Sequence, residues 1–229
     1  MKIKMNVGLF TMLLASIAGF CDAATFVAAD ELFSAHVTGN FIVFAYEMIK
    51  GSYPGAWVKL STFPIFVISV ITGGWVASKT ANRYLLLIVE GILLVASGIM
   101  AYWLKLQGAH DQKWPIYIVV MLIVFSMGLQ NTFGKIFSKE TLGPTTMMTG
   151  NVTQASIDIG NIIRSKLKDV TIAESLKKQM VTISGFLIGC LAGAIMGKYV
   201  GLGAVILPGL IMVVIYIDIR MNNSVYSIQ

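Results

Sequence analysis

The chain has 229 residues, of which 56% are hydrophobic and 12% are charged, and its mean hydropathy is +0.79. An average globular protein carries about twice that share of charge to cover its surface, so a soluble domain is excluded. Two cysteines are too few for a disulfide scaffold, and the hydropathy excludes disorder. The net charge of +6 lies in short gaps between apolar runs, so we expect the lipid bilayer, and no nucleic acid, as partner.

Six apolar runs predict membrane-spanning helices, because each approaches the roughly 20 residues that a bilayer crossing needs. In chain order they are Val7–Ala28, Leu60–Ser78, Tyr84–Leu104, Pro115–Phe133, Met180–Gly197 and Gly201–Ile217. None alternates with period two as barrel strands do. The first run exceeds the apolar core of a signal peptide, so we expect it to be retained.

Two further segments, Phe33–Ile49 and Pro144–Ile163, are shorter or more polar, and each contains the tripeptide Thr-Gly-Asn. Many hydroxyl and amide groups in the second would be costly against lipid, so it lines a protein interior or crosses incompletely. The sequence thus predicts an all-α, polytopic transmembrane bundle. It has six long helices and two shorter Thr-Gly-Asn helices in a single domain over residues 1–229.

The same order of features occurs twice. Thr38-Gly39-Asn40 recurs 111 residues later as Thr149-Gly150-Asn151, and Gly19-Phe20-Cys21-Asp22 has a counterpart 109 residues later in Gly128-Leu129-Gln130-Asn131. The small-residue pattern Ser69-x3-Gly73-x3-Ala77 reappears 120 residues later, and the linker Arg164–Lys178 absorbs the difference. We therefore predict two internal repeats, at about 7–104 and about 115–220.

The number of spans depends on the Thr-Gly-Asn segments. If both cross, the chain has eight spans in two parallel repeats of four; if neither does, six spans form two inverted repeats of three. Both alternatives place 12 basic residues on one side and 5 on the other, with the N-terminus on the basic side. Basic loops stay in the cytoplasm, so we expect a multi-pass membrane protein with a cytoplasmic N-terminus.

Glycine within a polar stretch permits a bend, and broken helices at matching places in two halves indicate a transporter site. Helix capping by Thr and Asn is the alternative. The predicted substrate-binding residues are Asp22, His36, Thr38, Asn40, Gln130, Asn131, Thr145, Thr149 and Asn151.

Asp22 and Glu90 lie within apolar runs, where an ionisable group is a functional candidate, so both are predicted coupling carboxylates. For Asp22 the alternative is a helix cap, and for Glu90 an ion pair across helices. Glu47 and Asp158 each follow a Thr-Gly-Asn motif by seven residues; they are either matched acids or solvated residues near helix ends.

Glycines also recur every four residues late in the chain, at Gly185, Gly189, Gly193 and Gly197. Such a small-residue stripe lets another helix backbone approach closely, so we predict a helix-packing role. The packed helix belongs either to the same chain or to a second copy, which would make a homo-oligomer.

The polar motifs resemble a known family. Gly19-x-x-Asp22-Ala23-x-x-Phe26 and Phe33-x-Ala35-His36-x-Thr38-Gly39-Asn40 resemble the signature of the YoaK-like bacterial inner-membrane proteins. Gln130-Asn131 and Thr145-Thr146-x-x-Thr149-Gly150-Asn151 are similar to the second-half motif of that family. The resemblance covers essentially the whole chain. It implies a multi-pass inner-membrane location and importance for both motifs, but no substrate, because the function of the family is unknown.

These observations predict a small-solute or ion transporter. The alternative is a non-transporting membrane interaction protein that associates through its Gly-rich helix. No nucleophile elbow, phosphate-binding loop or Cys/His spacing is present in the sequence, so we expect no enzyme, no metal and no cofactor.

Overall fold

The computed structural model describes residues 6–51, 55–108, 113–165 and 169–221. These residues form helices joined by short connections and contain no β-strand, as predicted for the all-α class. Within them, five helical stretches have the length and composition to cross a membrane, and the last runs from Val170 to Met221. The membrane class inferred from composition is therefore supported by the fold.

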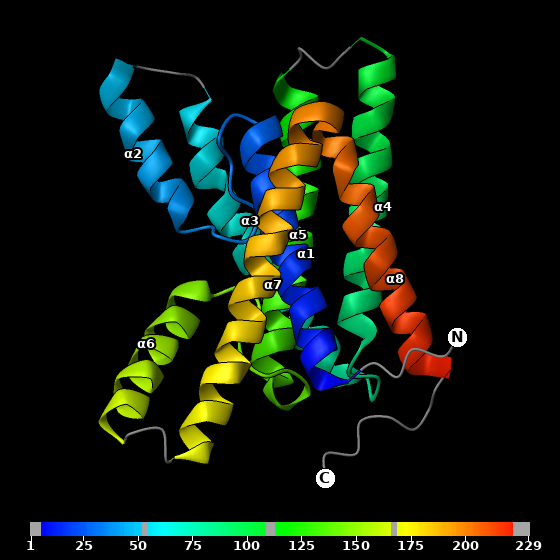
Figure 1. The fold of residues 1–229 in the computed structure, drawn as a ribbon. Coiled ribbons are helices and arrows are strands. Elements are labelled where there is room, and N and C mark those ends of the chain that lie inside the picture. The colour runs from blue at the N-terminus through cyan, green and yellow to red at the C-terminus, as the bar shows by residue number, and fades with distance from the viewer. Residues whose placement is uncertain (1–5, 52–54, 109–112, 166–168, 222–229) are drawn as a thin grey trace.

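The long helices alternate in direction along the vertical axis of the bundle (Figure 1). In chain order they are α1 (Val7–Ala28), α3 (Ala56–Lys79), α4 (Leu85–Leu106), α5 (Lys113–Ile136), α7 (Val170–Val200) and α8 (Ile206–Met221). A 3-10 turn, η3 (Gly201–Val205), reverses the chain between α7 and α8.

Helix α7 begins ten residues earlier than the apolar run that predicted it. Asp169 caps it by accepting hydrogen bonds from the backbone N–H groups of Thr171 and Ile172, so most of the expected linker Arg164–Lys178 is helical. Hydropathy marks only the part of a helix that suits lipid, whereas the cap sets where the helix begins. The polar first turns of α7 therefore extend beyond the apolar segment.

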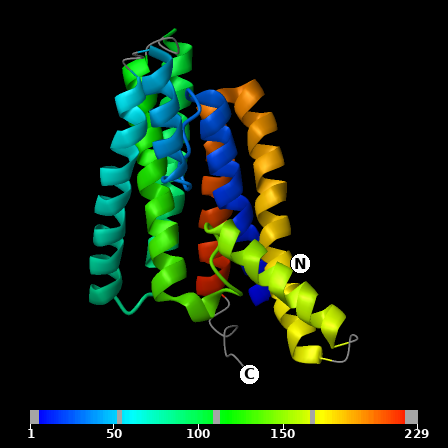
Figure 2. The same ribbon diagram turned by 90° about the vertical axis from the view of Figure 1, so that its left-hand side faces the viewer.

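Two further helices, α2 (Gly39–Gly51) and α6 (Met148–Arg164), begin at the Thr-Gly-Asn motifs. With 17 residues, α6 is not shorter than α8, which has 16, so the predicted difference in length holds only for α2. Neither is among the candidate spans. Both begin near mid-height of the bundle; α2 runs to the upper end and α6 to the lower end (Figure 1). The view turned by 90° places both on the same side of the long helices (Figure 2). We call α2 and α6 the half-helices.

The glycine stripe of α7 packs directly on α1. A Cβ atom added at Gly185 would lie 2.6 Å from the carbonyl oxygen of Met12. Added at Gly189 or Gly193, it would collide with the backbone of Ser16 or Phe20. The packed helix is therefore α1 of the same chain, and the stripe is buried.

Helices α4 and α8 also meet through glycine, and in a reciprocal way. A Cβ at Gly91 would lie 3.1 Å from the carbonyl oxygen of Gly209, and a Cβ at Gly209 would lie 2.9 Å from the carbonyl oxygen of Gly91. Each helix presents an equivalent surface to the other, as at a two-fold contact. This contact closes the side of the bundle away from the half-helices (Figure 1).

Candidate functional site

Asp22 on α1 anchors the loop that precedes the half-helix α2. Its side chain is 4% exposed. Oδ1 accepts the backbone N–H groups of Ala35 at 2.5 Å and His36 at 3.2 Å, and the hydroxyl of Ser34 at 3.5 Å. Oδ2 lies 2.5 Å from Nδ1 of His36. Charge-assisted hydrogen bonds of this kind are strong, so Asp22 fixes both the loop and the imidazole.

His36 in this loop is only partly buried. Its side chain is 36% exposed, and its ring contacts Phe33 and Phe186 edge-on. With Nδ1 held by Asp22, Nε2 is the ring nitrogen that remains for a proton or a solute. Asp22 therefore orients the imidazole of His36.

The asparagines of the two Thr-Gly-Asn motifs close their own loops. Asn40 Nδ2 donates to the carbonyl oxygen of Phe33 at 2.8 Å, and Asn40 Oδ1 accepts the N–H of the same residue at 2.9 Å. Asn151 Nδ2 likewise donates to the carbonyl oxygen of Pro144 at 2.8 Å. Asn40 also donates to Thr62 of α3 at 3.0 Å. Both asparagines therefore hold the irregular backbone that precedes their helix.

The two threonines of these motifs lie differently. Thr38 and Thr149 are exposed, and neither hydroxyl makes a hydrogen bond within the described part of the chain. The structure therefore separates Thr38 and Thr149 from the buried network that contains Asn40 and Asn151.

The second polar loop is held by neutral amides. Gln130 is fully buried on α5 and donates to the carbonyl oxygen of Leu14 at 2.8 Å and to the hydroxyl of Thr145 at 3.1 Å. Asn131 Oδ1 accepts the hydroxyl of Thr146 at 2.7 Å. Thr146 is not among the predicted site residues, although its place beside Thr145 in the motif could have identified it.

This loop borders a pocket of about 410 Å³ between α3, α5 and the start of α6. It is lined by Phe66, Val70, Asn131, Thr132, Gly134, Lys135, Pro144, Thr145, Thr146 and Met147. The predicted site residues Asn131 and Thr145 and their neighbour Thr146 thus form one wall. Phe66 and Val70 of α3 form an apolar wall. Lys135, counted only as a topology marker in the sequence, is the single charged residue of the lining.

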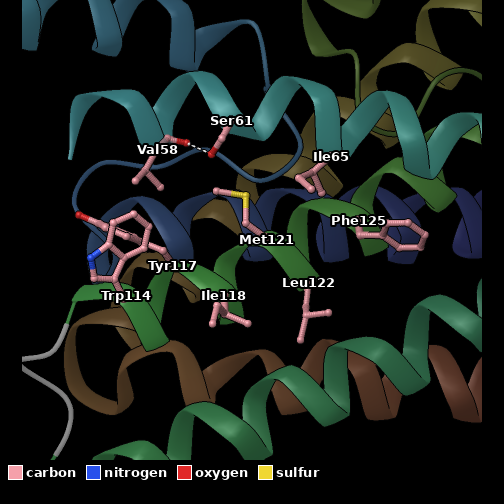
Figure 3. Close-up of a pocket in the computed structure, with 9 residues that line it drawn as sticks. All are labelled: Val58, Ser61, Ile65, Trp114, Tyr117, Ile118, Met121, Leu122 and Phe125. Carbon is pink, nitrogen blue, oxygen red and sulfur yellow. Dashed lines mark hydrogen bonds between the residues drawn. The ribbon is translucent and has the colours of Figure 1, made fainter. Parts of the chain in front are cut away.

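A second pocket, of about 300 Å³, lies nearer the other end of α3 and α5 (Figure 3). Its walls are apolar, and the hydroxyl of Ser61 is turned to the carbonyl oxygen of Val58 at 2.8 Å. Tyr117 donates its hydroxyl to Asp30 at 2.9 Å. With apolar walls and with the hydroxyls of Ser61 and Tyr117 already bonded, this pocket suits an acyl chain better than a polar solute.

Glu90 lies apart from both loops, fully buried on α4. Neither carboxyl oxygen has a hydrogen-bond partner in the part of the chain that the structure describes. A charged carboxylate without partners is very unfavourable in such a place, so Glu90 is expected to be protonated. Apart from the exposed Thr38 and Thr149, the predicted substrate-binding residues thus form two polar clusters, and Glu90 belongs to neither.

Glu47 and Asp158 attach the half-helices to the next long helix. Glu47 on α2 pairs with the buried Lys59 of α3 at 3.6 Å. Asp158 on α6 is 4% exposed and accepts the hydroxyl of Ser175 of α7 at 2.7 Å. These acids are therefore packed against protein, rather than fully solvated near helix ends.

The sequence profile of a family described as "Protein of unknown function (DUF1275)" matches residues 10–217. The UPF0700 transmembrane protein YoaK of Bacillus subtilis (strain 168) is 23% identical over 172 residues, which cover 75% of this chain and 76% of that protein. No solved structure matches the chain.

Proposed function

Because the chain belongs to the DUF1275 family, whose function is unknown, we propose a function from its site: transport of a small solute or ion across the cell inner membrane. Family membership and the transmembrane relative confirm the resemblance to YoaK-like proteins that the motifs indicated. They also support a multi-pass membrane protein.

The proposed topology has six spans, a cytoplasmic N-terminus and two inverted repeats of three spans. The loop before each half-helix enters from one end of the bundle and reaches mid-height, and the half-helix then runs back to that same end (Figure 1). This end is the upper one for α2 and the lower one for α6. Lys50 at the end of α2 would then be outside, and Lys79 at the end of α3 inside. Cysteines placed at Lys50 and Lys79 test this by accessibility to a membrane-impermeant thiol reagent. The opposite pattern would require eight spans.

Recurring side-chain contacts support the repeat. Asn40 donates to the carbonyl oxygen of Phe33 at 2.8 Å, and Asn151 donates to that of Pro144 at 2.8 Å. Each residue of the second pair lies 111 residues after its counterpart in the first, which is the spacing of the two motifs. A chance tripeptide match would not reproduce the hydrogen bond.

Recurring helix contacts support it independently. A Cβ at Gly19 would collide with the carbonyl oxygen of Phe186, and a Cβ at Gly128 would lie 3.4 Å from the carbonyl oxygen of Phe66. Gly128 follows Gly19 by 109 residues, and Phe186 follows Phe66 by 120, the spacings found in the sequence. Helix α1 therefore packs on α7 as α5 packs on α3.

The pair of half-helices that begin inside the bundle carries the transport proposal. Non-helical backbone at membrane depth is tolerated only where it is buried in protein or lines a cavity, and the loop before α6 lines a pocket. Discontinuous helices at matching positions of inverted repeats form the binding sites of many secondary transporters. The Asp22–His36 pair and Glu90 would supply groups that bind a coupling proton or cation.

The alternative, a membrane interaction protein, relied on the glycine stripe of α7 as its binding surface. Gly185, Gly189, Gly193 and Gly197 are buried, and each faces the backbone of α1. Helix α1 of the same chain therefore covers the stripe, which leaves no surface there for a partner protein. We retain the transporter as the proposed function.

Flux through the purified protein in liposomes tests the proposal. Proton movement is followed with an internal pH dye while candidate solutes are added outside, and His36→Gln is compared with His110→Gln, a change at the only other histidine of the sequence. We expect His36→Gln and Asp22→Asn to lower flux at least tenfold, whereas His110→Gln leaves it unchanged. Unaltered flux in Asp22→Asn and in the double variant Thr38→Ala/Thr149→Ala would refute the proposal.

A further inference from the structure

The two polar loops are held by different side chains, a carboxylate on α1 for the first and amides on α5 for the second. In the first, the carboxylate of Asp22 accepts the backbone N–H groups of Ala35 and His36 at 2.5 and 3.2 Å. This half of the protein thus contains a small anion-binding cradle that is filled by a side chain of the chain itself.

The second half has the same cradle without the carboxylate. At the repeat spacings, Asn131 replaces Asp22, and Thr146 and Met147 replace the two residues that donate their amides. Asn131 Oδ1 accepts the hydroxyl of Thr146, not a backbone amide. The backbone N–H groups of Thr146 and Met147 have no acceptor among residues 6–51, 55–108, 113–165 and 169–221. Thr146 is 5% exposed, and buried amides are rarely left without an acceptor, so a partner from outside the chain is indicated for its N–H group; Met147 is 65% exposed.

Other groups of the pocket offer hydrogen-bond donors as well. The hydroxyl of Thr145 accepts from Gln130 at 3.1 Å, and its own proton has no acceptor within the described residues. Helix α6 begins after Met147 with no side-chain cap, so its first amides are also available, and they carry the positive end of the helix dipole. Lys135 makes no ion pair with any described residue.

No carboxylate competes for these donors, because none of the ten residues that line the pocket is acidic. The lining therefore combines one cation with several donors at the polar end, whereas Phe66 and Val70 of α3 form an apolar wall. A pocket of about 410 Å³ is within the range that binds small molecules, roughly 300–1,000 Å³.

We propose that this pocket binds an oxyanion, a carboxylate with a short aliphatic body, which occupies in the second half the place that Asp22 occupies in the first. The inference rests on the proposed transport function and names its substrate class. A phosphate group of an anionic lipid offers the same oxyanion chemistry, so the experiment must separate a free solute from a lipid.

The test measures binding to the full-length protein, independently of transport. Thermal unfolding in a neutral detergent is followed during titration with acetate, butyrate or phosphate. Choline serves as the cationic control ligand, and glycerol as the neutral one. Lys135→Gln removes the charge, and Lys139→Gln is the matched control, because Lys139 is exposed on the same end of the bundle and does not line the pocket. Asn131→Asp supplies an internal carboxylate like that of the first half.

We expect carboxylates to raise the unfolding temperature of the native chain and of Lys139→Gln. In Lys135→Gln the apparent affinity should fall at least tenfold. In Asn131→Asp the response to carboxylates should disappear while the ligand-free protein remains folded. Equal responses in the native chain, Lys135→Gln and Asn131→Asp would overturn the proposal, as would stabilisation by choline or glycerol alone.

Nanodiscs of phosphatidylcholine and of phosphatidylglycerol identify the source of the oxyanion. Stabilisation by phosphatidylglycerol alone, lost in Lys135→Gln, would refute the carboxylate solute and assign the site to a lipid headgroup. Binding of carboxylates without any flux in liposomes would refute the transport function but leave this site. Flux of a solute that neither Lys135→Gln nor Asn131→Asp alters would refute this site and leave transport.

Discussion

The α1–α7 contact makes a quantitative prediction, because each glycine of the stripe meets a different obstacle. A Cβ at Gly189 would collide with the carbonyl group of Ser16, which is backbone and cannot turn aside. At Gly185 the nearest atom, the carbonyl oxygen of Met12, would be 2.6 Å away, and at Gly197 the nearest, the Cα of Ala24, would be 3.0 Å away. Alanine should therefore destabilise the fold most at Gly189, less at Gly185 and least at Gly197.

The expected magnitude follows from the cost of overpacking. One methylene forced into a packed interior costs about 1–3 kcal/mol, and Gly189→Ala belongs at the upper end because two backbones must separate. Gly74→Ala is the control, since a Cβ at Gly74 of α3 meets nothing within 4 Å. That change should be neutral, or stabilise by at most about 1 kcal/mol through helix propensity.

Unfolding in mixed micelles of mild detergent and dodecyl sulfate, followed by circular dichroism, would measure these differences. The order Gly189, Gly185, Gly197, Gly74 in decreasing cost is the decisive result. Equal stability of Gly189→Ala and Gly74→Ala would show that α7 does not lie against α1 as described.

Three further predictions concern the polar groups inside the bundle. Asn40→Ala should destabilise the protein more than Asn151→Ala in the same unfolding assay, because Asn40 makes three hydrogen bonds to neighbouring residues and each buried group left without a partner costs roughly 1–3 kcal/mol. Asp22→Ala should lower the free energy of unfolding by about 1–3 kcal/mol, since it leaves two loop amides without an acceptor. Asp22→Asn should retain the fold but lose coupled flux. Glu90→Gln should change stability by less than about 0.5 kcal/mol, because glutamine has the shape of a protonated glutamate, yet should alter the pH dependence of flux; a large loss of stability would mean that Glu90 is ionised.

Much of this fold is present in the sequence as hydropathy. The six apolar runs correspond to α1, α3, α4, α5, α7 and the segment η3–α8, because lipid demands side chains that need no water. Five helical stretches among the described residues qualify as spans, with α7 and α8 counted together. The depth of the half-helices was not predictable in the same way. The hydropathy of Phe33–Ile49 is the same whether this segment crosses the membrane or turns back. The start of α2 inside the bundle is visible only in the structure, where Asn40 bonds to Phe33 in the preceding loop.

The candidate site was predicted in part, for a related reason. Asp22 and the Thr-Gly-Asn motifs stood out because polar groups are rare in apolar runs. Lys135 did not, because a lysine near a helix end is ordinarily a topology marker. Thr62 and Ser34 were missed, since single hydroxyl residues are common in membrane helices and only their contacts with Asn40 and Asp22 distinguish them.

The α1–α7 contact also has a consequence for biosynthesis. The hydroxyl of Ser16 bonds to the carbonyl oxygen of Gly185, 169 residues later in the chain. A ribosome adding about 5–20 residues per second exposes α1 for many seconds before its packing surface exists. During that interval the small-residue face of α1 and the buried carboxyl of Asp22 need shelter from lipid. An insertase or translocon that holds α1 until α7 emerges would give the nascent protein that shelter, and cells depleted of it should accumulate half-inserted chains.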